Sequence, residues 1–390
     1  MKETMLFVDD DVNLLQGLQR MLRPKRHEWD MTFLSNPLEA LEKMKSQCYD
    51  VVVADMRMPE MDGAELLARV KDICPKSVRI ILSGQAELDT IMEAIGSTHQ
   101  YLSKPCDAEM LQSTIDKASK LRQLVRNEKL EEYVSQLRNI PSQPDLYDAV
   151  IRELQSPAPS LEIIGRIASK DMGMSAKILQ LTNSSFFGTK REVTSVHEGV
   201  GVLGSELLKR LFRDYDVFLR ADGDTIHGLH LGQLHRRGIS VGNFALRIAT
   251  VEDVDRSEAE MCSCTGLLCR IGCIIMARFA PELYQQVIAL EPESPAAVAK
   301  ERELFGTTHS EVGGYLLGLW GLPNAVVEAA SHHHGLAEQG SADHQPQDFS
   351  ILSALQIAEQ LASTTNFAAG ESVENFEQLR DYRSLLARIH

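Results

Sequence analysis

Three carboxylates and a lysine stand at the ends of apolar runs within the first 105 residues. Asp9 and Asp10 follow the first run, Asp55 ends the third and Lys104 follows the fifth. Carboxylates at contact distance repel by roughly 4 kcal/mol at an effective dielectric constant of about 20, so a group of three needs a cation. An all-oxygen site with few carboxylates suits Mg²⁺, and a carboxylate can attack phosphorus to give an aspartyl phosphate. These residue types therefore predict a Mg²⁺-dependent phosphoryl-acceptor site.

The apolar runs that position these residues alternate with amphipathic helical patterns. Most of the runs are rich in Val, Ile and Leu without polar alternation, which predicts parallel strands buried on both faces. Helices are expected around Leu14–Leu22 and from Pro37, Gly63, Glu87 and Asp107. Polar residues at the carboxyl ends of such strands converge on one edge of the sheet. The expected strands are Met5–Val8, Met31–Leu34, Val51–Ala54, Val78–Leu82 and Gln100–Ser103.

The polar residues at the strand ends stand in four segments: LFVDDD at 6–11, VVVADMRMPEMDG at 51–63, IILSG at 80–84 and YLSKP at 101–105. Through these segments, residues 1 to about 120 resemble the receiver domain of two-component response regulators. The resemblance implies a flavodoxin-like (βα)5 fold. It also implies that a sensor histidine kinase or a phosphotransfer protein supplies the phosphoryl group.

The metal and acceptor residues implied by the resemblance come from the first and third strands. Asp55 would be the phosphoacceptor. Asp10 would bind Mg²⁺ directly, Asp9 mainly through water, and the backbone carbonyl of Arg57 would be a third protein ligand.

The remaining roles implied by the resemblance belong to the fourth and fifth strands. Ser83 would be the switch hydroxyl, Lys104 the phosphate-binding lysine and Tyr101 the switch aromatic residue. Asp11 is expected to cap the first helix instead of binding metal.

The segment from Lys117 to Asn139 is dominated by charged residues with apolar residues at roughly helical spacing. We interpret it as an extended last helix of the first domain with a solvated outer face. A helical lever or short coiled coil between two domains is the alternative. The expected divisions are a receiver domain at 1–120, a helical linker at 121–139 and an output domain at 140–390.

After Ile140-Pro141 the sequence has few apolar runs of the kind that predict strands. Residues that are typical of helix ends are found instead. Thr308 and Glu311 have the spacing of a capping box. Pro323 suits the first turn of a helix and Gly335 suits its end. The second domain is therefore predicted to be all-helical.

The second half contains GLLCRIG at 266–272, HSEVGGYLL from His309, WGLP at 320–323, His332–His334 and the stretches at 169–185 and 234–249. These segments give it a resemblance to the HDOD domain, a relative of the HD metallohydrolases, with its core at about 137–340. It implies that the domain acts through contacts with a downstream protein.

The sequence departs from the hydrolase pattern where metal ligands are needed. Cys269 and Arg270 occupy the place of the His-Asp pair, and Arg237 aligns with an upstream histidine. An arginine always carries positive charge and cannot bind a cation. We therefore expect no enzymatic activity, and His309 lacks the companions of a metal site. The alternative is a receiver-controlled phosphodiesterase acting on a cyclic dinucleotide.

Other possible ligands in the second half have simpler interpretations. Cys262, Cys269 and Cys273 fall on one helical face among apolar residues, where Cys behaves as a small buried hydrophobe, although zinc or an iron–sulfur cluster is an alternative. The three consecutive histidines at 332–334 are expected to point in different directions. A position at a helix C-terminus, where positive charge is favourable, explains them without a metal.

Composition narrows the function classes further. The chain has 390 residues and a formal net charge of −15, which argues against nucleic-acid binding and a transcription-factor role. Seven scattered cysteines argue for reduced thiols in a cytoplasmic protein. No secretory leader or membrane span is expected, since the best candidate, 265–280, contains Arg270 and Arg278. A homodimer is possible.

Overall fold

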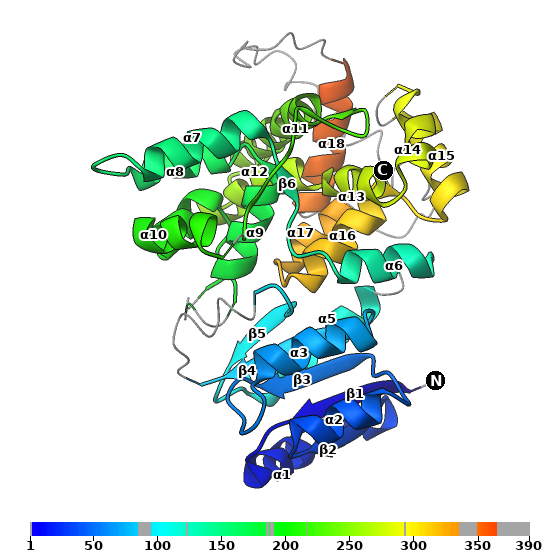
Figure 1. Ribbon diagram of the computed structural model, residues 1–390. Helices are drawn as coiled ribbons and strands as arrows, with labels where there is room; N and C mark the ends of the chain where they lie inside the picture. Colours follow the sequence, from blue (N-terminus) through cyan, green and yellow to red (C-terminus); the bar gives the residue numbers. More distant parts are fainter. Residues whose placement is uncertain are drawn as a thin grey trace.

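The computed structural model describes residues 2–84, 95–121, 124–184, 187, 191–215, 217–291, 294–334 and 349–364. Figure 1 shows a sheet-containing domain, coloured blue to cyan, below a larger helical domain. This is the predicted order of an α/β domain followed by a mostly helical one. The helix expected from Glu87 and the helix end expected at Gly335 lie outside the described residues.

A parallel five-stranded sheet in the order β2-β1-β3-β4-β5 forms the first domain. All five expected strands are confirmed, with ends shifted by no more than two residues. Residues of β3 and β4 are buried throughout, as expected for central strands that are covered on both faces. The strands are β1 (Glu3–Val8), β2 (Trp29–Leu34), β3 (Val51–Asp55), β4 (Val78–Ser83) and β5 (Gln100–Ser103).

Helices cover both faces of this sheet. Phe7 and Val53 point to the face covered by α1 and α5, and the alternate residues Leu6 and Val52 point to the face covered by α2 and α3. Asp11 caps α1 as predicted, because its carboxylate accepts hydrogen bonds from the amides of Asn13 and Leu14. The helical elements are α1 (Val12–Met21), the 3-10 helix η1 (Arg23–His27), α2 (Pro37–Met44), α3 (Gly63–Ile73) and α5 (Ala108–Leu121).

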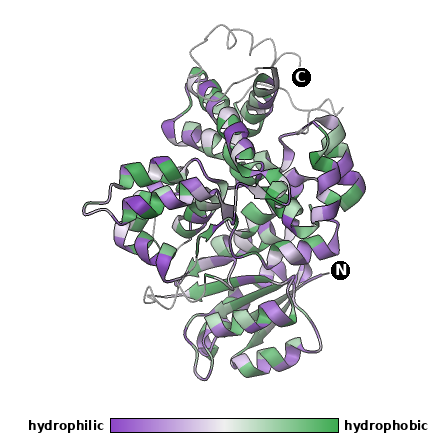
Figure 2. Ribbon diagram, turned by 45° about the horizontal axis from the view of Figure 1, so that its top comes forward, coloured by the Kyte–Doolittle hydropathy of each residue, from purple (hydrophilic) through white to green (hydrophobic). Residues whose placement is uncertain are grey.

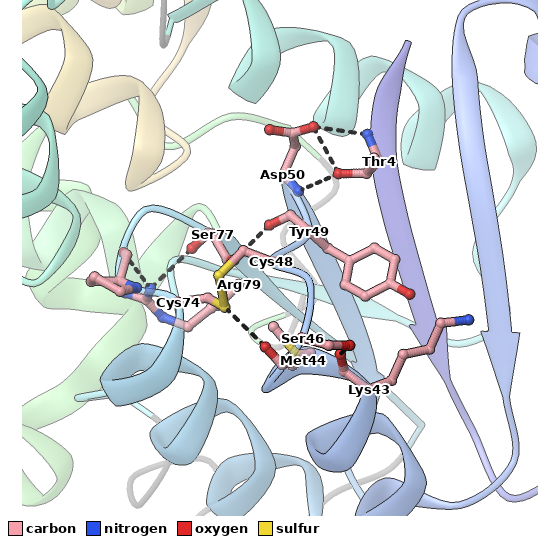
Figure 3. Close-up of a disulfide and its surroundings, with 11 residues drawn as sticks. Thr4, Lys43, Met44, Ser46, Cys48, Tyr49, Asp50, Cys74, Ser77 and Arg79 are labelled. Atoms are coloured by element: carbon pink, nitrogen blue, oxygen red, sulfur yellow. Dashed lines mark hydrogen bonds between the residues drawn. A yellow bond between two sulfur atoms is a disulfide. The ribbon is translucent and has the colours of Figure 1, made fainter. Parts of the chain in front are cut away.

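The expectation that the cysteines are all reduced is wrong for one pair. Cys48 and Cys74 form a disulfide, with their Cα atoms 5.6 Å apart (Figure 3). The two residues are 26 positions apart in the sequence. They meet because α2 and α3 pack side by side on one face of the sheet, which a count of scattered cysteines does not reveal. The other five cysteines form no disulfide within the described residues.

The segment between the domains is neither one extended helix nor a solvated lever. α5 ends at Leu121, and a new helix, α6 (Glu128–Ser135), begins after Asn127, whose side chain accepts a hydrogen bond from the amide of Leu130. Leu130 and Val134 are buried. The helical periodicity was correctly identified, but the apolar residues of α6 pack into the protein core instead of lining a free-standing helix.

The second domain is built almost entirely from helices, as predicted. Two pairs of two-residue strands interrupt them, β6 (Pro141–Ser142) with β7 (Leu219–Arg220) and β8 (Thr225–Ile226) with β9 (Leu229–His230). The helices are α7 (Pro144–Leu154), α8 (Leu161–Ala168), α9 (Met172–Thr182), α10 (Val196–Arg213), α11 (Leu231–Val251), α12 (Arg256–Leu268), α13 (Ile271–Phe279), α14 (Pro281–Ile288), α15 (Pro295–Phe305), α16 (His309–Leu319), α17 (Asn324–His332) and α18 (Ile351–Thr364).

Two local predictions in this domain can be compared with the structure. The capping box of Thr308 and Glu311 is confirmed, with both reciprocal hydrogen bonds present. Pro323 is the residue before the first turn of α17, one position earlier than expected.

One stretch of the described residues, Arg256–Phe279, is long and apolar enough to cross a membrane. The mean hydropathy of an 18-residue window within it is 1.5, and 78% of that window is buried inside the protein. It comprises α12 and α13, and a core position explains its composition. Figure 2 shows that the strands of the sheet are mainly hydrophobic, whereas the helices around them carry both hydrophilic and hydrophobic residues.

The buried guanidinium of Arg79 connects the two domains. Arg79, in β4, is 2% exposed and donates to the carbonyl oxygens of Ser97 at 2.6 Å and Ser77 at 2.9 Å. It also donates to the carbonyl oxygen of Ser135, at the end of α6, at 2.5 Å. The hydroxyl of Ser135 lies 3.0 Å from that of Tyr315 in α16. One buried cation thus holds the sheet domain against α6 and, through α6, against the helical domain.

A second buried cation lies at the same interface. Lys177 in α9 is 1% exposed, and its ammonium donates to the Gln180 side chain at 2.7 Å and lies 4.3 Å from the Trp320 ring centroid. Gln180 in turn donates to the backbone carbonyl of His99, just before β5. Burial lowers the pKa of Lys177 to about 7, with a smaller contribution from the charge of Lys71.

We predict that replacing Lys177 by Met changes how stability depends on pH. Between pH 7 and about 10.4 the unfolded chain holds a proton on Lys177 that the folded chain has lost, so the stability of the wild type rises with pH. Below pH 7 both states are protonated and the burial penalty is fully present. At pH 7 the Met variant should therefore have a higher free energy of unfolding than the wild type. The difference between the two proteins should be about 2–3 kcal/mol smaller at pH 9 than at pH 7.

Urea unfolding at the two pH values measures this difference. Lys170→Met, which removes an exposed lysine nearby, is the matched control and should follow the wild type. Parallel stability curves for wild type and Lys177→Met would contradict the prediction.

Candidate functional site

The predicted acidic residues and lysine meet at the carboxyl edge of the sheet. The ammonium of Lys104, just after β5, lies 2.5 Å from Asp9 Oδ2 and 2.5 Å from Asp55 Oδ1. Asp9 and Asp55 are buried, and Lys104 is about one-fifth exposed. The parallel register of β1, β3, β4 and β5 brings the ends of these strands together, as the sequence predicted.

Asp10 completes a group of three carboxylates at this edge. One oxygen each of Asp9, Asp10 and Asp55 lies within 4.8 Å of the others, and Asp10 is exposed. This all-oxygen donor set, open to solvent on one side, fits Mg²⁺ with several waters retained. Arg57 contributes a backbone amide that donates to Asp55 Oδ2 at 3.0 Å. The role of its carbonyl as a metal ligand stays a prediction.

The charges at this edge depend on one another. Burial has the largest single effect on the pKa of Lys104 and lowers it. The hydrogen bonds that Lys104 donates to Asp55 and Asp9, together with the charges of these carboxylates, outweigh burial, so the pKa is raised overall and the ammonium stays charged. Burial raises the pKa of Asp55, against the opposing effect of the Lys104 hydrogen bond. The buried Asp55 carboxylate is therefore paired with a charged lysine.

The two proposed switch residues lie on adjacent strands. Ser83 ends β4 and is 7% exposed, and Tyr101 lies in β5 with its ring buried. Burial raises the pKa of Tyr101, so its phenol remains neutral.

Gly63 is a residue at this edge whose role the sequence analysis did not identify. A Cβ atom at Gly63 would lie 2.2 Å from the backbone carbonyl oxygen of Asp55. Glycine thus allows α3 to begin directly against the end of β3. The MDG triplet at 61–63 was the available signal.

In the helical domain, a second group of polar residues surrounds Arg270. Arg270 is fully buried, and its Nη2 lies 2.6 Å from both carboxylate oxygens of Glu359 in α18. Arg237 lies 3.9 Å from the same carboxylate. Burial of an unpaired charge is costly, so the guanidinium requires this partner. Glu359 was not identified from the sequence, although it is the lone charged residue in the apolar stretch Ile351–Ala362.

The expectation that the consecutive histidines point in different directions is wrong for His333 and His334. One ring nitrogen each of His309, His333 and His334 lies within 4.8 Å of the others. The side chains meet because α16 begins where α17 ends, so the first residue of one helix faces the last turn of the other. The statement that His309 lacks companions is therefore also wrong.

The cysteines of this region are buried, as expected, but they adjoin possible ligands. Cys269 lies with His333 and Glu359, and Cys273 lies with Glu301 and His309. Cys262 is buried, and burial raises its pKa to about 12.

A cavity of about 370 Å³ opens beside this cluster. His309, Glu301 and Cys273 line one part of it, and Arg237 lines another. The remaining wall is mainly apolar and includes Tyr284 and Ile288. The cavity therefore joins a few buried polar groups to an apolar surface, the usual composition of a small-ligand pocket.

Two protein-family models match this chain, each over a different part of it. The model for the response regulator receiver domain matches residues 5–116, and the model for the HDOD domain matches residues 140–336, half of the chain. These matches agree with the sheet domain and the helical domain.

Individual relatives match parts of the chain. The hydrogenase transcriptional regulatory protein HoxA of Bradyrhizobium diazoefficiens is 26% identical over 50% of this chain and 42% of its own length. The transcriptional regulatory protein ZraR of Klebsiella oxytoca is 33% identical over 40% of this chain and 34% of its own length. The chain thus spans less than half the length of these curated relatives.

Among solved structures, the MmoQ response regulator of Methylococcus capsulatus is 20% identical. The match covers 64% of this chain and 96% of that chain, with a TM-score of 0.49.

Proposed function

Since this chain belongs to the response regulators that carry a receiver domain followed by an HDOD domain, we propose that it accepts a phosphoryl group on Asp55 and transmits the change through protein contacts of its helical domain. The donor is a sensor histidine kinase or a phosphotransfer protein. The observation that carries the proposal is the position of Lys104, which bridges Asp9 and Asp55 at the carboxyl edge of the sheet.

The geometry supports in-line attack by a carboxylate. Asp55 is buried but opens to the edge at which Asp10 is exposed, so a donor can approach from that side. A phosphoryl group on Asp55 would carry about −1.5 to −2 charges and would compete with Asp9 for the Lys104 ammonium. Ser83, at the end of the neighbouring strand, would donate its hydroxyl to a phosphoryl oxygen. Mg²⁺, held by Asp9, Asp10 and Asp55, would supply further charge neutralisation when bound.

The proposed path to the output domain runs along β5. Lys104 follows this strand, Tyr101 lies within it, and Gln100 begins it. The Gln100 side chain donates to the carbonyl of Gly318 in α16 at 3.1 Å. A shift of Lys104 towards a phosphoryl group would thus act on a strand whose other end already contacts the helical domain. Phosphorylation would bias the equilibrium between arrangements of this interface.

The helical domain is proposed to act on a downstream protein without catalysis. Hydrolysis by HD-type enzymes needs a metal-bound His-Asp pair, and Cys269 and Arg270 replace that pair. The Arg270–Glu359 ion pair fills this position with a fixed guanidinium. A role in DNA binding is not proposed, because the net charge of −15 disfavours contact with phosphates.

We predict that Asp55 is the phosphorylation site and that labelling requires a divalent cation. A small phosphodonor with Mg²⁺ should give an acid-stable, base-labile label on the wild type. Asp55→Ala and wild type in excess chelator should remain unlabelled. Full labelling of either would refute the assignment.

We predict that phosphorylation alters the domain interface. Hydrogen exchange in β5, α6 and the C-terminal half of α16 should change severalfold when a beryllium fluoride phosphoryl mimic is bound, because these elements share the Arg79 and Gln100 contacts. Asp55→Ala in the same buffer is the control. Identical exchange in all three elements would mean that the signal does not pass through this interface.

We predict that the full-length protein does not cleave cyclic dinucleotides or a generic phosphodiester when Mn²⁺ is added. Such chemistry uses two metal ions, and Arg270 repels a cation at the place of the missing pair. Product release should stay at the level of buffer. Turnover that depends on Mn²⁺ and disappears in His309→Ala would support the alternative, a receiver-controlled phosphodiesterase.

A further inference from the structure

We propose that His309, His333 and His334 form a site for a single transition-metal ion, of the kind that takes Zn²⁺, where α16 and α17 meet. The three side chains come from the start of one helix and the end of the other. One ring nitrogen of each lies within 4.8 Å of the others. This cluster offers three imidazole nitrogens, whereas the acidic group on the receiver domain offers carboxylate oxygens.

His309 has the orientation of a metal ligand. Its Nδ1 lies 2.8 Å from Glu301 Oε2, and both side chains are buried. A hydrogen bond from one ring nitrogen to a carboxylate fixes the tautomer and leaves the other nitrogen to bind a metal, as in many histidine sites. The remaining nitrogen, Nε2, lies 3.1 Å from His334 Nε2. Two nitrogens bound to one tetrahedral Zn²⁺ at about 2.0–2.1 Å are separated by roughly 3.3 Å.

His333 supplies a buried nitrogen that needs a partner. Its Nδ1 lies 2.8 Å from the carbonyl oxygen of Ala330, so this nitrogen carries the proton and donates. Its Nε2 is buried and accepts no hydrogen bond from any described residue. A buried polar atom without a partner costs free energy of folding. A bound metal ion would satisfy it, and no local hydrogen bond competes for that lone pair.

The donor set and the charges select the ion. Three imidazoles favour Zn²⁺ and its neighbours among the transition metals over Mg²⁺ and Ca²⁺, which prefer oxygen. Glu301 provides a negative charge next to His309, and Glu359 neutralises Arg270 nearby. The Arg270–Glu359 ion pair places a guanidinium beside the cluster, so we assign a single ion to the three imidazoles. The site is therefore compatible with a domain that lacks two-metal hydrolysis.

Metal binding would join α16 to the end of α17. An ion that binds the folded state and not the unfolded chain stabilises the fold in proportion to its concentration. The site would thus act as a clip between these two helices, next to the 370 Å³ cavity that His309 also lines.

The test uses untagged full-length protein, stripped with a chelator and then loaded with Zn²⁺ in excess Mg²⁺, so that the receiver site is occupied. Elemental analysis after gel filtration should show about one zinc per chain. X-ray absorption of the loaded wild type, which needs no variant, should show imidazole nitrogens at about 2.0–2.1 Å. Co²⁺ loading should give the visible spectrum of a nitrogen-ligated ion.

His332→Gln is the matched control, because His332 belongs to the same triplet but is exposed. It should bind zinc as the wild type does. His334→Gln, which alters a half-buried side chain, should weaken zinc binding by at least about 100-fold, since even outer partners of metal sites contribute 10–100-fold. Zinc should raise the Tm of wild type and His332→Gln but not of His334→Gln. Asp55 labelling and circular dichroism report whether each variant is folded.

Two results would overturn the proposal. Loss of all zinc from the wild type during gel filtration would show that no site exists. Equal zinc binding by His332→Gln and His334→Gln would show that the ion is held elsewhere on the surface. Neither result would bear on phosphorylation of Asp55.

Discussion

The buried guanidinium of Arg79 is the interaction on which the arrangement of the two domains depends. A permanent charge at 2% exposure is tolerable only when its donors meet acceptors, and backbone carbonyls supply them here. One of these carbonyls belongs to Ser135 at the end of α6. His99 accepts a hydrogen bond from the Arg79 amide through Nδ1, and its Nε2 lies 2.9 Å from the same Ser135 carbonyl. Burial keeps the pKa of His99 well below its usual range, so its neutral ring can serve both contacts.

Charge compensation also organises the two polar sites, with different consequences. At the sheet edge, the Lys104 ammonium is shared between two carboxylates and is partly exposed, so an incoming anion can compete for it. In the helical domain, the Arg270 guanidinium is fully buried and faces both oxygens of one carboxylate. The first arrangement can be altered by a ligand, whereas the second is fixed by its geometry. This difference supports the proposed function, in which the receiver domain responds to a ligand and the helical domain acts through protein contacts.

The interface between the domains uses close contacts that leave little room for adjustment. Gly318 in α16 approaches Leu121 so closely that a Cβ atom would lie 2.0 Å from the leucine side chain. Asn127 donates to the carbonyl of Phe305 beside it. Lys177 and Gln180 continue the contact towards His99. A small movement of β5 would therefore displace several helices that pack against it, because packed interiors transmit strain.

The sequence by itself determined the order of the domains, the strands and the acidic residues and lysine that meet at the carboxyl edge of the sheet. These features follow from local patterns, since apolar runs define the strands and the carboxyl ends of parallel strands share one edge. Only the tertiary structure decided which distant residues meet. Cys48 and Cys74 pair because α2 and α3 pack together, Glu359 reaches Arg270 from a helix 89 residues away, and His309 meets His333 and His334. Such contacts depend on how helices pack against one another, and residue spacing along a single helix contains no information about its neighbours.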